Sequence, residues 1–227
     1  MFRIKICGIT NLADAQLAVD AGADAIGLNF YAASPRACTH QAAQQIVECL
    51  PGAVGKVGVF VNAPTAEVRA TATTLALDMV QLHGDEPPET LRELKGLAVV
   101  RAFRPGSDYA KVREYLHQCH SMTCMPRMVL IDALVEGVYG GSGRTADWQT
   151  LIHERAALAG QPLVLAGGLT PSNVAAAIAL VRPWAVDVAG GVEESPGRKS
   201  AKLVTDFVRE AKAALSIRGR TEASRPL

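Results

Sequence analysis

A thiol and a carboxyl group stand at the ends of two short apolar runs. Cys7 closes the run 2–7 just before Gly8, and Asp132 closes the run 128–132. A short apolar run beside a glycine is typical of a buried strand that ends at a turn. A thiolate can remove a proton and a half-buried carboxyl group can donate one, so the pair would suit general acid–base chemistry. Taken alone, Cys7 fits an ordinary buried cysteine better than a catalytic one. Asp132 fits a structural residue as well as it fits an acid.

Three further polar side chains accompany other apolar runs. Arg36 follows Ser34-Pro35, and a guanidinium held there would bind a substrate carboxylate through paired hydrogen bonds, although an isolated Arg is usually a surface residue. His83 is the only one of the five histidines at the end of such a run. Metal sites in barrels need more ligands than that, so we expect His83 to shape the pocket and no metal to be bound. We expect Asp187, within the last run, to contact substrate.

Glycine-rich turns gather in the second half of the chain, at 140–143, 167–168 and 190–191. Glycine lets the backbone come close to a ligand, and the N-terminus of a following helix favours an anion. The alternative is that glycine merely closes tight turns. The position of the last two turns favours a phosphate site. The predicted phosphate-binding residues are Gly141, Ser142, Gly143, Gly167, Gly168, Gly190 and Gly191.

The elements that must position these groups alternate regularly. Continuous apolar runs are typical of parallel strands covered on both faces. Eight strand–helix units predict a closed (β/α)₈ barrel over residues 1–215, followed by a flexible tail over 216–227. An open doubly wound sheet would alternate in the same way, but no Gly-x-Gly-x-x-Gly motif follows the first run. The expected strands are 3–7, 25–30, 56–61, 79–83, 98–103, 128–132, 162–166 and 185–189, and the expected helices are 11–21, 40–50, 65–75, 87–94, 109–119, 147–158, 171–181 and 199–215.

Composition narrows the class of protein. The 227 residues are 49% hydrophobic but only 5% aromatic, which predicts an aliphatic core. A net charge of +1 without a long basic face gives no indication of nucleic-acid binding. No run approaches the ~20 apolar residues of a membrane span. Five cysteines without a Cys-x-x-Cys pair, and no secretory signal, indicate a cytoplasmic protein with reduced thiols.

Recognisable motifs follow one another in order along nearly the whole chain. They are Lys5-Ile6-Cys7-Gly8-Ile9-Thr10, Gly27-Leu28-Asn29-Phe30-Tyr31, Ser34-Pro35-Arg36, Gly58-Val59-Phe60-Val61-Asn62, Val80-Gln81-Leu82-His83-Gly84-Asp85-Glu86, Leu130-Ile131-Asp132, Gly140-Gly141-Ser142-Gly143-Arg144-Thr145-Ala146-Asp147-Trp148, Leu165-Ala166-Gly167-Gly168-Leu169 with Asn173, and Val186-Asp187-Val188. In this order they resemble the phosphoribosylanthranilate isomerase family. The resemblance implies a (β/α)₈ barrel that carries out an Amadori rearrangement in tryptophan biosynthesis. It implies that N-(5-phosphoribosyl)anthranilate becomes 1-(2-carboxyphenylamino)-1-deoxyribulose 5-phosphate, without a cofactor.

Matched position by position, the resemblance makes Cys7 the general base, Asp132 the general acid and Arg36 the group that meets the anthranilate carboxylate. A thiolate base requires a depressed pKa, for which Lys5 and the cationic iminium intermediate are candidates. One departure stands at Ala189-Gly190, where the family pattern has a Ser pair. We expect this loop to bind phosphate more weakly or in a rearranged way. The oligomeric state, monomer or homodimer, stays open.

Three other functions remain as alternatives. A ribulose-phosphate epimerase would need His and Asp metal ligands on several strands. An indole-glycerol-phosphate synthase would need a catalytic Lys paired with Glu, and Lys5 and Lys56 show no such pattern. A phosphate-binding barrel without catalysis would fit the altered loop, but it would need neither Cys7 nor Asp132.

Overall fold

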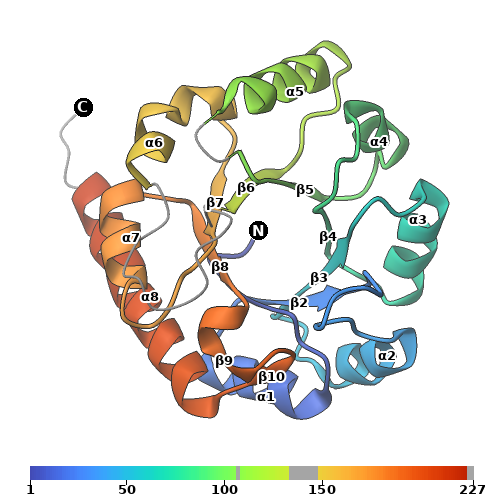
Figure 1. The fold of residues 1–227 in the computed structure, drawn as a ribbon. Coiled ribbons are helices and arrows are strands. Elements are labelled where there is room, and N and C mark those ends of the chain that lie inside the picture. The colour runs from blue at the N-terminus through green and yellow to red at the C-terminus, as the bar shows by residue number, and fades with distance from the viewer. Residues whose placement is uncertain (106–107, 133–147, 224–227) are drawn as a thin grey trace.

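Eight parallel strands form a closed barrel, with the helices arranged around it (Figure 1). The computed structural model describes residues 1–105, 108–132 and 148–223. Each strand pairs with the next along the chain, and β8 closes the ring against β1. This confirms the predicted barrel and excludes the open doubly wound sheet. The strands are β1 (Ile4–Cys7), β2 (Ala25–Asn29), β3 (Gly55–Phe60), β4 (Met79–Leu82), β5 (Val99–Phe103), β6 (Met128–Asp132), β7 (Leu163–Ala166) and β8 (Ala185–Val188).

The helices follow the strands with two additions. Short 3₁₀ helices, η1 (Arg155–Leu158) and η2 (Gly190–Val192), follow α6 and β8, and a hairpin of β9 (Glu193–Ser195) and β10 (Arg198–Lys199) precedes α8. No helix within the described ranges is long and apolar enough to cross a bilayer. The helices are α1 (Leu12–Ala21), α2 (His40–Cys49), α3 (Thr65–Thr74), α4 (Pro88–Glu93), α5 (Ala110–Ser121), α6 (Trp148–His153), α7 (Val174–Val181) and α8 (Ala201–Ala223).

The end of the last helix differs from the sequence prediction. We expected helix to stop at Leu215 and a loose tail to begin at residue 216, but α8 continues to Ala223. No proline interrupts residues 216–223, and a helix that is already formed extends at the cost of one residue's freedom per new hydrogen bond. The helix therefore extends past its expected end at Leu215, the loose attachment of the tail stays a prediction, and residues 224–227 lie outside the described part of the chain.

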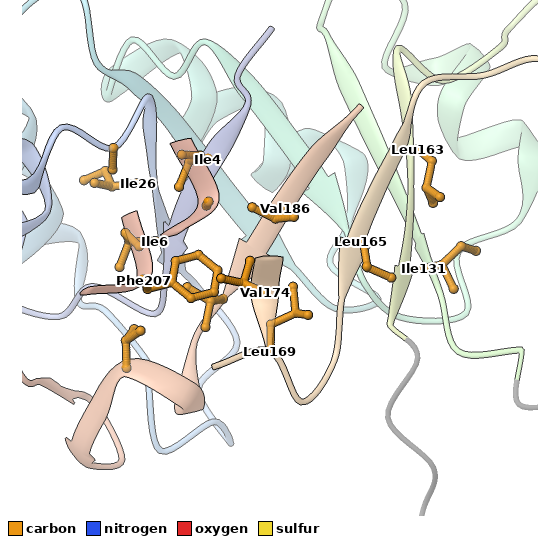
Figure 2. Close-up of a cluster of buried hydrophobic side chains, with 14 of the residues drawn as sticks. Ile4, Ile6, Ile26, Ile131, Leu163, Leu165, Leu169, Val174, Val186 and Phe207 are labelled. Atoms are coloured by element: carbon orange, nitrogen blue, oxygen red, sulfur yellow. The ribbon is translucent and has the colours of Figure 1, made fainter. Parts of the chain in front are cut away.

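The alternation of side chains along each strand separates two apolar regions. Ile4 and Ile6 point outward from β1 and pack with Phe207 of α8 (Figure 2). A second cluster, with members from seven of the strands, fills the barrel interior. Because both faces of every strand are covered, the strands read as unbroken apolar runs. The interior cluster consists of Phe2, Ala25, Val57, Met79, Val100, Ala102, Met128, Leu130, Val164, Ala166 and Ala185.

Two aliphatic side chains of α7 provide a matched test of the outer layer. Ile178 is 1% exposed and Leu180 is 44% exposed. We expect Ile178→Ala to lower the free energy of unfolding by about 2–5 kcal/mol, because it leaves a cavity between α7 and the barrel. Leu180→Ala should cost about 1 kcal/mol or less. Urea denaturation of both variants checks this, and equal losses would contradict the described packing of α7.

Candidate active site

Cys7 lies at the carboxyl end of β1 beside a glycine that makes room for it. In the β1–β2 register Cys7 is paired with Gly27. A Cβ atom at Gly27 would stand 2.6 Å from the Cys7 Sγ, much closer than any real contact. The thiol therefore occupies space that any other residue at position 27 would fill.

Lys5 points into the barrel on the same face as Cys7. Its side chain is fully buried, and its Nζ lies 3.2 Å from Asp187 Oδ2 and 2.5 Å from Gln81 Oε1. Burial disfavours the ammonium, but Asp187 and Cys7 outweigh that effect and raise the pKa of Lys5. The barrel thus encloses a positive charge at the level of the thiol. Asp187 Oδ1 is buried and has no hydrogen-bond partner among the described residues.

The electrostatics of Cys7 differ from the sequence prediction. We expected a depressed thiol pKa with help from Lys5. Removal from water instead raises the pKa of Cys7, and Asp187 adds to that shift, while Lys5 and Lys199 oppose it. The expectation fails because burial, which disfavours a thiolate, outweighs the two cations.

Asp132, at the end of β6, faces a histidine and an arginine. The His83 Nε2 atom lies 3.9 Å from Asp132 Oδ2, and Arg104 Nε donates a hydrogen bond to the same oxygen at 3.4 Å. The other ring nitrogen of His83, Nδ1, lies 2.8 Å from Gln81 Nε2. Burial, followed by Arg104, Lys5 and Arg101, lowers the pKa of His83 to about 3. His83 is therefore neutral at physiological pH. Its neutral ring places no positive charge beside Asp132.

Arg36 is held by a carboxylate that the sequence analysis did not single out. Its Nε and Nη2 atoms donate to Glu193 at 2.9 and 2.7 Å. Lys199 Nζ reaches the same carboxylate at 2.7 Å. Burial works against ionisation, but Arg36 and Lys199 prevail and lower the pKa of Glu193. The fork is thus fixed in direction at the mouth of the barrel. Gly8, at φ +74°, leaves space for it, because a Cβ there would lie 2.7 Å from Arg36 Cδ.

The two glycine turns after β7 and β8 lie against each other. Gly167 and Gly168 adopt φ values of +88° and +63°, which other residues rarely adopt. A Cβ at Gly191 would lie 1.8 Å from the Leu169 carbonyl oxygen, so this backbone approach needs a glycine. Gly190 begins η2, a short helix of the kind that accompanies phosphate sites in barrels. Gly141, Ser142 and Gly143 lie outside the described residues.

A cavity of about 520 Å³ opens beside His83 and Arg104, between the ends of β4 and β5 and helix α5.

The structure gathers Cys7, Asp187, His83 and Asp132 at the carboxyl end of the barrel and places Arg36 at its rim. Lys5, named only as a helper, and Gln81 and Glu193, which we did not assign, complete the group. Period-two alternation from Cys7 and His83 points to Lys5 and Gln81, so a signal for these two was present. Among the described residues no group of three or more His, Cys, Asp or Glu side chains could hold a metal ion.

The fold and the site define a (β/α)₈ barrel enzyme, with its titratable groups at the carboxyl ends of the strands. Residues 4–210 match the family model described as N-(5'-phosphoribosyl)anthranilate (PRA) isomerase. The chain belongs to this family. An isomerase of that name from Geobacter sulfurreducens is 48% identical over 214 residues, covering 93% of this chain and 99% of the relative. Another from Pseudomonas syringae is 48% identical over 211 residues, covering 91% and 95%.

Solved structures agree with this assignment. The phosphoribosyl anthranilate isomerase of Thermotoga maritima has a TM-score of 0.82 and 40% identity, covering 94% of this chain and all of that one. A second isomerase structure has a TM-score of 0.79 and 38% identity, with the same coverage. That protein is in complex with reduced 1-(o-carboxyphenylamino)-1-deoxyribulose 5-phosphate.

The space beside the thiol gives a direct test. We expect Gly27→Ala to lower kcat/KM by about tenfold or more, because the new methyl group must displace the Cys7 side chain and small misplacements are costly. Gly55→Ala on β3 is the matched control, since a Cβ there meets Ala25 Cβ at 3.4 Å, an ordinary contact. Steady-state kinetics and thermal unfolding of both variants check this. Wild-type kinetics for Gly27→Ala would show that the thiol's position is unimportant.

Neutral His83 makes stability depend on pH. The pKa of His83 is about 3 when folded and near the ordinary 6.5 when unfolded, so between these values the unfolded state binds the extra proton. The contribution of neutral His83 to the free energy of unfolding is complete above pH 6.5 and is lost as the pH falls toward 3. From pH 7 to pH 5 this amounts to about 2 kcal/mol. We expect His83→Asn to lose correspondingly less stability over that range in urea denaturation; identical losses would contradict the neutral assignment.

Proposed function

We propose that this chain converts N-(5-phosphoribosyl)anthranilate to 1-(2-carboxyphenylamino)-1-deoxyribulose 5-phosphate, the Amadori step of tryptophan biosynthesis, with Cys7 as general base and Asp132 as general acid. The observation that carries the proposal is their setting. A thiol on β1 and a carboxyl group on β6 stand at the same end of the barrel, connected by the contacts of Lys5, Gln81 and His83. That end is where barrel enzymes carry out their chemistry.

The two proton transfers divide between these groups. Asp132 donates a proton to the ribose ring oxygen as the C1–O bond breaks, which leaves an iminium cation at C1. The thiolate of Cys7 then removes the proton from C2. The C–H electron pair forms the C1–C2 double bond and neutralises the iminium nitrogen, and the resulting enolamine tautomerises to the ketone. Neither transfer requires a metal or an organic cofactor.

The iminium cation also offsets the raised pKa of Cys7. In the barrel the thiol is held protonated by burial, with Lys5 and Lys199 partly offsetting that effect. A cation formed on the substrate beside the sulfur favours the thiolate at the moment when it is needed. The base is therefore expected to be generated within the complex, not in advance.

Substrate contacts follow from the remaining groups. The guanidinium of Arg36, oriented by Glu193, receives the anthranilate carboxylate. Asp187 Oδ1, buried and unpartnered among the described groups, is suited to accept a hydrogen bond from a sugar hydroxyl. The turns at 167–168 and 190–191 take the phosphate through backbone N–H groups, with residues 141–143 as the third part of that site. With Ala189-Gly190 in place of two serines, phosphate binding rests more heavily on the backbone.

The small-molecule substrate is the only partner that the proposal requires. One related structure is that of monomers generated from the dimeric isomerase of Thermotoga maritima. For this chain either a monomer or a homodimer fits the proposal, since every proposed catalytic group comes from one chain. All five cysteines are free thiols, which fits a reducing cytoplasm.

Removal of either proton-transfer group should nearly abolish turnover without unfolding the barrel. We expect Cys7→Ala and Asp132→Asn each to lower kcat by about 10²–10⁴-fold, the usual contribution of a positioned acid or base. A fluorescence assay of substrate consumption measures this, and circular dichroism monitors the fold. Normal turnover in either variant would remove that residue from the mechanism.

The same assay separates the alternative functions. Turnover that survives a metal chelator supports the isomerase, whereas loss on chelation would favour a metal-dependent epimerase. Binding of the substrate analogue without turnover would favour a phosphate-binding barrel that lacks catalysis.

A further inference from the structure

Gln81 occupies the centre of a buried polar chain that runs from Lys5 to the candidate acid. It lies on β4 with its side chain inside the barrel and is fully buried. On one side its Oε1 meets Lys5 Nζ at 2.5 Å, and on the other its Nε2 meets His83 Nδ1 at 2.8 Å. Beyond His83 stands Asp132, with its Oδ2 at 3.9 Å from Nε2. Every link except the last is a hydrogen bond.

The donor and acceptor roles along this chain have only one solution. An ammonium group has donors and no acceptor, so Lys5 must face the amide oxygen of Gln81. The amide NH₂ then faces His83 and can only donate, so Nδ1 must be the unprotonated ring nitrogen. A neutral imidazole carries its one proton on the other nitrogen. The proton of His83 is therefore on Nε2, the atom directed toward Asp132.

The opposite tautomer would fail at Gln81 from the start and at Asp132 once that residue has given up its proton. A proton on Nδ1 would oppose the amide NH₂, donor against donor. The lone pair of Nε2 would then face the carboxylate that Asp132 becomes, and repel it. His83 Nε2 is buried and has no hydrogen-bond partner within the described ranges, which leaves its N–H available for a group that approaches.

We propose that Gln81 is a positioning residue that selects the tautomer of His83. Because its amide oxygen faces the ammonium of Lys5, its NH₂ faces His83 Nδ1 and keeps the ring proton on Nε2, which is directed at Asp132. Resting on the proposed function, the inference assigns this N–H a task in the reaction. When Asp132 gives its proton to the ring oxygen it becomes a carboxylate, and the N–H stabilises that charge by closing the remaining gap. In this proposal Gln81 contacts no substrate atom and transfers no proton.

Direct observation of the tautomer tests the first half. In protein labelled with ¹⁵N-histidine, the two ring nitrogens of a neutral imidazole resonate far apart, according to which one carries the proton. The His83 signals are assigned as those that disappear in His83→Asn. We expect the wild type to show Nε2–H at neutral pH. An Nδ1–H ring, or an average of both forms, would overturn the proposal without any assay of turnover.

Two substitutions test the second half. Gln81→Glu offers an acceptor to both neighbours, so His83 should switch to Nδ1–H and kcat should fall about 10–100-fold with KM nearly unchanged. Gln81→Met, similar in length but without polar atoms, should lose the tautomer preference and lower kcat in the same way, which keeps the test available if the buried carboxylate prevents folding. A switched tautomer with wild-type kcat would overturn the assigned task.

The matched controls are Gln45→Glu and Gln45→Met, at an exposed position of α2. Both should retain the His83 signals and the wild-type kinetics. Because the tautomer is read without substrate, failure of the isomerase assay in the wild type would count against the proposed function alone, and the nitrogen spectra would still decide on Gln81.

Discussion

A positive charge buried inside the barrel organises the site. An ammonium group cannot be left unpaired in a protein interior, where desolvation costs several kcal/mol. Lys5 is fully buried and is compensated by Asp187 and Gln81, which come from β8 and β4. The contact with Gln81 crosses the barrel, and the contact with Asp187 joins β1 to β8, the pair of strands that closes the ring, so both form only when the barrel is complete. They also restrict how each partner is oriented, since the ammonium accepts nothing.

The inward-facing positions of the strands carry two kinds of side chain. Val57, Leu130 and Val164 belong to the apolar cluster that fills the interior. Lys5, Cys7, Gln81 and Asp187 also point inward, and Lys5 and Cys7 share a face because residues two apart on a strand do so. Burial shifts the pKa values of Cys7 and His83, upward for the thiol and downward for the imidazole.

A second charge cluster sits at the rim and depends on the hairpin after β8. Lys199 of β10 donates its backbone N–H to Asp14 of α1 at 3.0 Å, and Thr10 donates its hydroxyl to the Gly197 carbonyl at 2.8 Å. These bonds attach the hairpin to the start of α1. Glu193 of β9 is thereby brought to Arg36, more than a hundred residues earlier in the chain. Because Glu193 accepts hydrogen bonds from one edge of the Arg36 guanidinium, the guanidinium is held in a fixed orientation at the rim.

Much of the fold was predictable from the sequence, because strand and helix periodicity is local. The runs that end at Cys7, Asp132 and near His83 all became strands of the barrel. The differences lie at helix ends and after β8, where α7 begins at Val174, α8 continues to Ala223 and the hairpin of β9 and β10 was not expected. The candidates Arg36 and Asp187 lie at or near the barrel mouth for the same reason. Gln81 lay in a recognised motif, and alternation from His83 directs it into the barrel, but its contact with Lys5 depends on strands that meet only in the closed ring.

By itself the sequence determined which residues face inward, where the strands end and that a thiol and a carboxyl group would share one end of a barrel. The tertiary structure alone decided that Lys5 is buried between Asp187 and Gln81, that the pKa of Cys7 is raised instead of lowered, and that Glu193 holds Arg36. The physical reason is that periodicity is a property of neighbouring residues. Desolvation and charge pairing depend instead on groups that meet only when distant parts of the chain enclose them.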